Sequence, residues 1–346
     1  MGCWCSARSQ TLVGDVTGPH SQVSLWQLLQ KEEDGMTEVQ DPTVQRRRLR
    51  MELRRARDAA GLKQAAVARA MDWSPSKLVR IETGQVSVST NDLKVLLDYY
   101  GVKDQLRINS LLDLAKSTRG GSFYDQYTDV LKPGFKEYLA YEGSASVIRQ
   151  YDPVLISGLL QTEEYGRVIL EQVAELGPEE VNKAWAVRQH RQELHDRETP
   201  PDMIIVVDEA AIRRHVGCGH VMCHQLERLK EFAAEPHISL RVLPFSRGAH
   251  PGMAAGNFIL LEFADPNLDD LLHLESIREI TIRDNQELVA QYLDKFFRLE
   301  QLALPSDESN ALLDKLIHEM SLSTNATTTS DIDDSERPPG RSPPDK

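Results

Sequence analysis

One stretch decides the fold of the first part of the chain: Gln64-Ala-Ala-Val-Ala-Arg-Ala-Met-Asp-Trp-Ser-Pro-Ser-Lys-Leu-Val-Arg-Ile-Glu-Thr-Gly84. A Ser-Pro pair at 74–75 supplies a helix N-cap and a first helical residue that needs no amide donor. Ala68 is the small residue that two crossing helices need where they touch. Five apolar residues fall at inward positions, namely Val67, Met71, Trp73, Leu78 and Ile81. The pattern therefore predicts two short helices that cross steeply through a tight turn, a helix-turn-helix.

The sequence around this motif predicts three more short helices that share its core. One runs from Arg46 to Ala60 and ends at Gly61, a residue typical of a helix C-terminus. Two others follow, one that is capped by Thr90 or Asn91 and runs to Tyr100, and one over 105–117. Together the five helices form an N-terminal all-α domain over residues 43–119.

The charge of this region differs from that of the rest of the chain. The whole sequence holds 40 Lys and Arg against 53 Asp and Glu, a net charge of -13. Residues 43–119 hold 16 Lys and Arg against 8 Asp and Glu. A basic segment in an otherwise acidic chain indicates that this segment binds a polyanion. Double-stranded DNA is therefore the partner we expect first.

The region Leu49–Gly84, together with 93–101, resembles the XRE-type (lambda repressor/Cro-like) helix-turn-helix family. The resemblance implies a five-helix DNA-binding domain that acts as a homodimer on two half-sites about one helical turn apart. It places Gln64 where the family's glutamine contacts phosphate and braces the recognition helix. It also places Arg57 and Glu82 on the ion pair that joins the first helix to the recognition helix.

The sequence departs from the family at two positions. Asp72 occupies the turn position usually held by glycine, which an aspartate tolerates better than most residues. Pro75 occupies a base-reading position and has no side-chain donor. Base recognition is therefore expected from Ser76, Lys77 and Arg80, with Ser74 near the DNA backbone. Arg80 can read guanine or hold phosphate, and the sequence does not distinguish these.

The first helix carries arginines that either contact phosphates or form a solvated face, and both interpretations stay open. They are Arg46, Arg47, Arg48, Arg50, Arg54 and Arg55.

The rest of the chain predicts an α+β domain over residues 120–322, with a sheet covered by helices. Residues 127–150 are expected to be helical, and Gly120 marks a hinge. Strand-like runs follow at 203–207, 238–243 and 257–263, and weaker ones at 271–274 and 279–282. We expect a poorly ordered leader over 1–42, of which residues 1–35 are absent if translation starts at Met36, and a disordered tail over 323–346.

Four blocks of this domain resemble the C-terminal domain of an actinobacterial, antitoxin-like regulator family, a domain formerly of unknown function. They are 158–165, 186–192, 206–211 and 242–252, and the resemblance spans about 141–320. It implies a transcriptional regulator that is commonly paired with a small protein partner. The resemblance implies no catalytic residues.

A run of possible zinc ligands also stands out, comprising His215, Cys218, His220, Cys223 and His224. Structural zinc sites usually draw ligand pairs from two separated segments, whereas this run is single. We therefore assign no metal and no cofactor. The loop 245–252, with His250, is the one place similar to an active-site loop, and it suits a ligand or partner lid equally well.

No segment has the roughly 18 uncharged apolar residues of a membrane helix, so we expect a cytoplasmic protein with no membrane partner. We predict a DNA-binding transcriptional regulator rather than an enzyme. Its recognition helix, 74–83, would enter the major groove, and its C-terminal domain would bind a small protein partner or ligand. The alternative is a protein-binding adaptor, or an enzyme in the C-terminal domain with the helix-turn-helix as a docking module.

Overall fold

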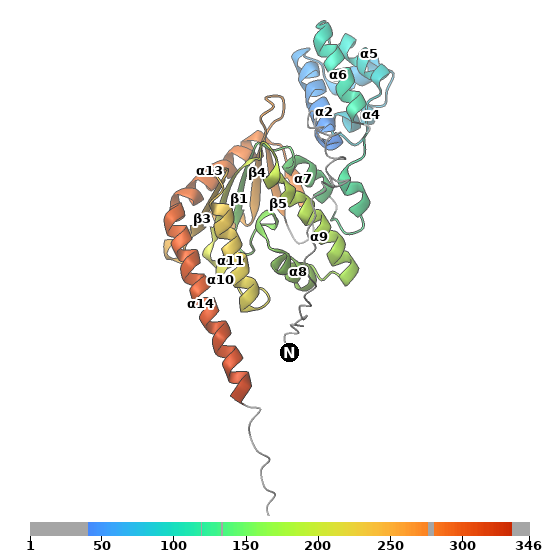
Figure 1. Cartoon of the computed structure of the whole chain (residues 1–346). Coiled ribbons are helices and arrows are strands. Elements are labelled where there is room, and N and C mark those ends of the chain that lie inside the picture. Colours follow the sequence, from blue (N-terminus) through green and yellow to red (C-terminus); the bar gives the residue numbers. More distant parts are fainter. Residues whose placement is uncertain (1–40, 119, 133, 276–279, 334–346) are drawn as a thin grey trace, which may run out of the picture. The chain divides into compact units, whose positions relative to one another are not determined.

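The structure is a computed structural model that describes residues 41–118, 120–132, 134–275 and 280–333, with side chains to residue 322 (Figure 1). Nearly all of the expected leader and the last part of the expected tail lie outside these ranges. Among the described helices, none is both long and apolar enough to cross a bilayer.

The first part of the described chain is a module of five helices around one core. The helices are α2 (Pro42–Ala59), α3 (Gln64–Ala70), α4 (Pro75–Glu82), α5 (Thr90–Tyr99) and α6 (Gln105–Ser117). Their buried leucine, valine, isoleucine and alanine side chains form a single cluster. The predicted all-α module is confirmed. Helix α5 is capped by Ser89, whose hydroxyl accepts from the Asp92 amide at 3.0 Å, so the expected cap at Thr90 or Asn91 is wrong by one or two residues.

The second part contains a mixed sheet with the strand order β3-β2-β1-β4-β5-β6. Strands β1, β2 and β3 are parallel, and β4, β5 and β6 continue the sheet in antiparallel pairing. The strands are β1 (Val147–Asp152), β2 (Asp202–Asp208), β3 (Ile238–Leu243), β4 (Phe258–Glu262), β5 (Leu271–Glu275) and β6 (Ile280–Arg283). This arrangement confirms the predicted α+β domain.

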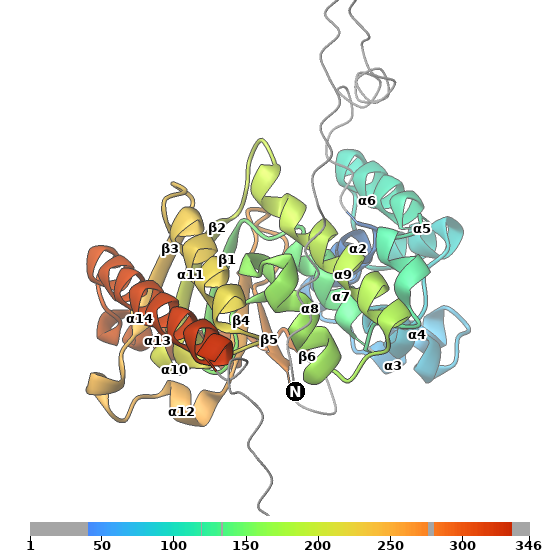
Figure 2. The ribbon, with the colours of Figure 1, turned by 60° about the horizontal axis from the view of Figure 1, so that its bottom comes forward.

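Helices cover both faces of the sheet (Figures 1 and 2). One face packs against α7 (Phe135–Glu142), α8 (Glu163–Gln172), α9 (Pro178–Gln192), α11 (Gly219–Ala233) and α14 (Ser306–Asp333). The other face packs against α13 (Gln286–Leu302), through side chains such as Phe296. Helices α11 and α14 lie against each other over much of their length.

Two segments differ from the sequence-based expectation. The expected helix over 127–150 is interrupted, since α7 ends at Glu142 and β1 begins at Val147. Pairing with β2 and β4 on both sides stabilises this strand, and such tertiary pairing outweighs local preference. Helix α14 continues to Asp333, beyond the start of the expected tail at 323. Extending a helix that is already docked requires less free energy than starting a new one.

Helix α2 belongs to the cores of both parts. Leu49 and Leu53 are buried in the helical module, whereas Val44 and Met51 are buried in the core of the sheet domain. Between them Arg47 is 1% exposed, and its guanidinium lies 5.4 Å from the ring centre of Tyr141. Burial lowers the pKa of Arg47. The sheet domain therefore holds the first helix of the module directly.

Two buried titratable groups lie in the sheet. Asp152, at the end of β1, accepts from Gln150 Nε2 at 2.8 Å, while its other carboxyl oxygen has no partner among the described residues. Burial raises the pKa of Asp152 to about 7. On β5, burial lowers the pKa of His273 to about 4. The folded state therefore favours the neutral form of both side chains.

We predict that Asp152→Asn changes how stability depends on pH. Between about pH 4 and 7 folded Asp152 holds a proton that the unfolded chain has released, so raising the pH lowers the free energy of unfolding, by up to about 1.4 kcal/mol per unit. His273 acts in the opposite direction from about pH 4 to 6.5. The variant should therefore gain stability relative to wild type as the pH rises to 7. Urea denaturation followed by circular dichroism at pH 5 to 8 measures this, and a difference that is constant with pH would contradict it.

Candidate nucleic-acid interface

Helices α3 and α4 form the predicted helix-turn-helix (Figure 2). Val67 and Ala68 on α3 are fully buried where the two helices meet, and Leu78 and Ile81 on α4 are almost fully buried. Asp72 in the turn has φ 53°, in the left-handed region that the family's glycine would adopt. The tight crossing thus depends on the small side chain of Ala68 and on the unusual backbone at Asp72.

A buried ion pair fixes the recognition helix α4 to α2. Arg57 donates from Nε to Glu82 Oε1 at 2.7 Å and from Nη2 to Oε2 at 3.1 Å. This hydrogen bonding raises the pKa of Arg57. Gln64 Nε2 donates to Glu82 Oε2 at 2.7 Å, so its side chain braces α4 as the resemblance implied. Its contact with phosphate stays a prediction.

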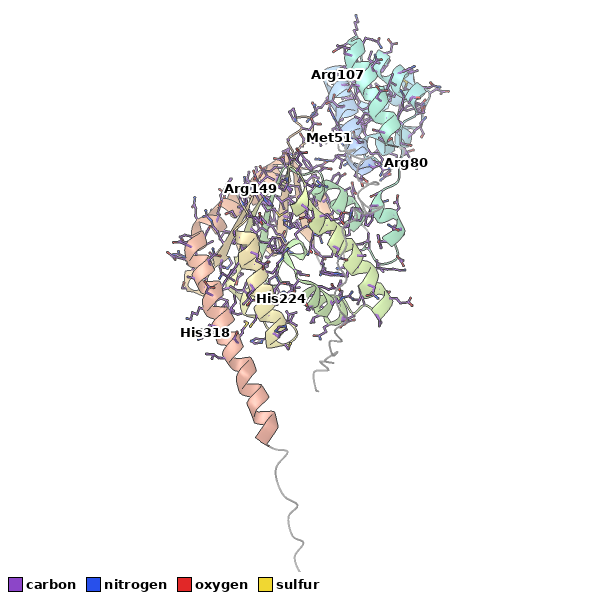
Figure 3. The ribbon with its side chains drawn as sticks, in the orientation of Figure 1. Met51, Arg80, Arg107, Arg149, His224 and His318 are labelled. Carbon is purple, nitrogen blue, oxygen red and sulfur yellow. The ribbon has the colours of Figure 1, made fainter. Side chains whose placement is uncertain are left out.

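The outward face of α4 carries polar side chains at helical spacing. Ser76, Arg80 and Thr83 are exposed, and Arg80 is labelled in Figure 3. The Arg80 side chain makes no hydrogen bond or ion pair with any described residue. Val79 also lies on this face, with 41% of its surface exposed. Val79 is not among the contacts predicted from the sequence, although its spacing of three from Ser76 and four from Thr83 could have indicated it.

Two predicted contact residues are held by the protein itself. Lys77 Nζ lies 3.7 Å from the ring centre of Trp73 and 3.3 Å from Asp92 Oδ2. Ser74 occupies the N-cap position, but its hydroxyl lies 3.1 Å from Ser76 Oγ instead of capping an amide. Arg80 is thus the predicted contact whose charge is unpaired within the described residues.

The arginines of α2 contact protein groups that the sequence did not indicate, and their contact with phosphate stays a prediction. Arg48 pairs with Asp265 at 3.1 Å and Arg55 with Asp269 at 2.9 Å, both in the loop between β4 and β5. Arg50 and Arg54 donate to backbone oxygens at the end of α4, at 3.0 and 3.3 Å. This basic helix therefore joins the module to the sheet domain and to α4.

The Cys- and His-rich run spans the start of α11. Cys223 Sγ lies 3.8 Å from the Ile317 carbonyl oxygen on α14, and His224 Nδ1 lies 3.4 Å from Glu164 Oε2. Within the described ranges no group of three or more His, Cys, Asp or Glu side chains is placed to hold a metal ion. The structure therefore does not bring the five residues together as a ligand set.

A cluster of polar side chains lies where the loop before β4 meets the ends of β1 and β2. His250 Nε2 lies 3.6 Å from Asp208 Oδ2, and the Tyr151 hydroxyl donates to the same oxygen at 3.4 Å. The His250 side chain is only 7% exposed. A buried histidine that packs against a helix-capping carboxylate stabilises the loop, and its burial leaves little surface for a substrate.

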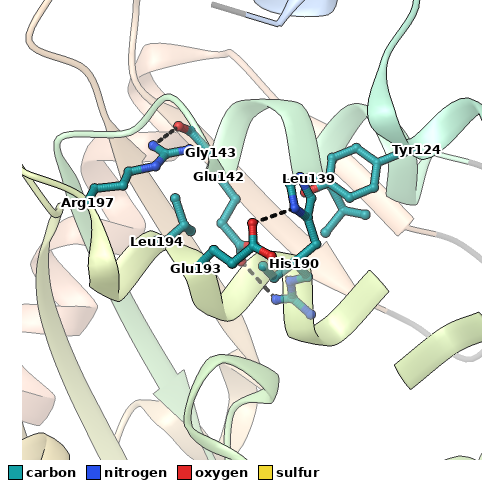
Figure 4. A pocket seen from close by; sticks show the side chains of 9 residues that line it. Tyr124, Leu139, Glu142, Gly143, His190, Glu193, Leu194 and Arg197 are labelled. Carbon is teal, nitrogen blue, oxygen red and sulfur yellow. Dashed lines mark hydrogen bonds and ion pairs between the residues drawn. The ribbon is translucent and has the colours of Figure 1, made fainter. Parts of the chain in front are cut away.

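A cavity of about 180 Å³ lies between η1 (Phe123–Tyr127), α7, α9 and η3 (Glu193–Asp196) (Figure 4). Most of its polar side chains are paired with one another. Glu142 accepts from Arg191, and His190 Nδ1 lies 2.7 Å from Glu193 Oε2. The cavity is thus polar, with its charges largely balanced.

Comparison with known families finds one match in the helical module and one in the sheet domain. Residues 48–108 match the helix-turn-helix domain, a type of module that binds DNA, and residues 135–315 match a domain of unknown function, DUF5753. No curated protein and no solved structure matched the chain.

Replacing Glu82 by alanine should loosen α4 more than replacing Gln64. Removing Glu82 takes two hydrogen bonds from the buried Arg57 and leaves it only the exposed Asp58, 2.7 Å from Nη1, and the Leu62 carbonyl oxygen, which lowers stability by about 3 kcal/mol. Gln64→Ala removes one hydrogen bond worth about 1 kcal/mol. Amide hydrogen exchange across α3 and α4, read by mass spectrometry, should be about 100-fold faster than wild type in Glu82→Ala and about fivefold faster in Gln64→Ala. Equal exchange in the two variants would show that the ion pair does not fix the helix.

Proposed function

The chain belongs to the DUF5753 domain family, and from this premise we propose that it is a sequence-specific, DNA-binding transcriptional regulator of the XRE type. One observation carries the proposal. The helix-turn-helix presents an exposed polar face whose arginine, Arg80, is unpaired among the described residues.

In the proposed mechanism α4 enters the major groove. Arg80 reads guanine through its guanidinium fork, and Val79 contacts a thymine methyl group. Ser74 and Ser76 lie at the N-terminal end of α4, where recognition helices approach base edges and backbone. Gln64, at the start of α3, binds a phosphate while it braces Glu82.

The remaining parts of the proposal concern assembly. We propose a cytoplasmic homodimer on two half-sites, because such modules pair their recognition helices about one helical turn apart. We also propose that the regulator is antitoxin-like, and that its C-terminal domain binds a small protein partner or ligand. We assign this domain no catalytic activity. The helix-turn-helix match does not favour the alternatives of an adaptor or an enzyme.

Selection from a random-sequence duplex library tests the proposal. Wild-type protein should enrich a motif with two half-sites, and Arg80→Ala should bind the enriched duplex about 10- to 100-fold more weakly, since a guanine contact contributes about 1–3 kcal/mol. Fluorescence anisotropy at fixed salt measures the affinity.

Arg107→Ala is the matched control for charge. Arg107 lies in the same module, on α6, where it pairs with Glu52 at 2.9 Å (Figure 3). Its removal changes the net charge by the same amount and should alter affinity by less than about threefold. Equal losses in the two variants, or no enriched motif with wild type, would refute the assignment of α4 as the reading helix.

A further inference from the structure

Two arginines of α9 lie side by side against η2 (Gly158–Leu160). A Cβ atom placed on Gly158 would lie 3.0 Å from Arg191 Nη1 and 3.4 Å from Arg188 Nε. Both guanidinium groups therefore lie close to the same glycine, and a Cβ atom at this position would contact both.

Arg191 is fully neutralised by a carboxylate. Its Nε and Nη2 atoms donate to the two oxygens of Glu142 at 2.8 and 2.9 Å. Tyr138 also donates its hydroxyl to Glu142. Glu142 is 1% exposed, so its charge is committed to Arg191.

Arg188 has no carboxylate partner among the described residues. Its Nη1 donates to the uncharged amide oxygen of Gln161, while Nε and Nη2 make no hydrogen bond with any described residue. Burial and the neighbouring Arg191 lower the pKa of Arg188 to about 10, so the group stays positive at neutral pH. The side chain is half-buried and so remains within reach of a solute.

Among the described residues, Glu275 is a nearby carboxylate that acts on Arg188, but it is itself paired with a lysine. Glu275 pairs with Lys132 at 3.1 Å, and burial lowers the pKa of His273 to about 4, so this imidazole is neutral at pH 7. Arg188, Arg191 and Glu142 together carry one excess positive charge. A partly buried charge without a partner is unfavourable, and an anion that reaches it is bound correspondingly well.

We propose that the free Nε and Nη2 edge of Arg188 binds a carboxylate group of a ligand. Two parallel N–H donors match a carboxylate in plane and spacing, and Arg191 uses the same two atoms for Glu142. The carboxylate belongs either to a small organic acid or to an acidic residue of a partner protein. The assignment rests on the proposed function, because it names the chemistry by which the C-terminal domain recognises its ligand.

Acetate is the simplest probe, with the full-length protein in the absence of DNA. Exchange of 100 mM sodium chloride for 100 mM sodium acetate should raise the melting temperature of wild type by about 3 °C more than that of Arg188→Gln. Arg167→Gln removes an exposed arginine of α8 that pairs with Glu163, and should respond as wild type does. A difference of zero between wild type and Arg188→Gln overturns the proposal.

Two further measurements keep the test decisive if Arg188→Gln fails to fold. In ¹⁵N-labelled wild type, acetate should shift the Nε–Hε signal of one arginine, and Gly158→Ala, which retains the charge but places a Cβ atom against Nε, should weaken that shift at least fivefold. Unshifted arginine signals at 100 mM acetate would rule out the site.

Acetyl-aspartate amide separates the two sources of the carboxylate. Shifts with both probes support a site open to an acidic side chain of a partner, and shifts with acetate alone support a small acid. None of these readouts uses DNA, so the two proposals can fail separately. If the protein selects no DNA motif but binds acetate through Arg188, the regulator proposal is refuted and the carboxylate site is supported.

Discussion

Helix α2 lies in two hydrophobic cores at once, and the positions of the other functional elements follow from that constraint. On one side Leu49 and Leu53 anchor it in the helical module, and on the other Val44 and Met51 anchor it in the sheet domain. The same helix carries Arg57, which holds Glu82 and therefore the recognition helix. A change in the sheet domain that displaces α2 acts on α4 through this ion pair and through the hydrogen bonds of Arg50 and Arg54 to the end of α4. This gives the C-terminal domain a physical route to DNA binding.

Most of the helical module could be predicted from sequence because its signals are local. Apolar spacing, the Ser-Pro start at 74–75 and Gly61 each act within one or two helical turns, and the five helices follow them closely. Strand β1 could not be predicted, since it is stabilised by pairing with β2 and β4, which are distant in sequence. The arginine contacts to Asp265 and Asp269 were missed for the same reason.

The outward face of α4 shows that prediction from sequence is limited in the same way for single side chains. Helical spacing identified the outward positions of α4 but not what lies opposite them. Lys77 meets Asp92 and Trp73 because α5 and the turn supply these groups, and neither is implied by the spacing within α4. The Arg80 side chain makes no hydrogen bond or ion pair with a described residue, so the structure distinguishes Arg80 from Lys77, whereas helical spacing does not.

The pairing of arginines with the acidic domain also limits how strongly the module can attract DNA. Of its 16 Lys and Arg, those that are exposed and not paired with a carboxylate among the described residues are Arg54, Lys63, Arg69, Arg80, Lys94 and Lys103. Each phosphate contact contributes about 0.9 to the slope of log affinity against log salt, so these six allow a slope of about 5 per protomer. A steeper slope would require α2 arginines to leave Asp265 and Asp269. Salt dependence thus reports whether the two parts stay joined on DNA.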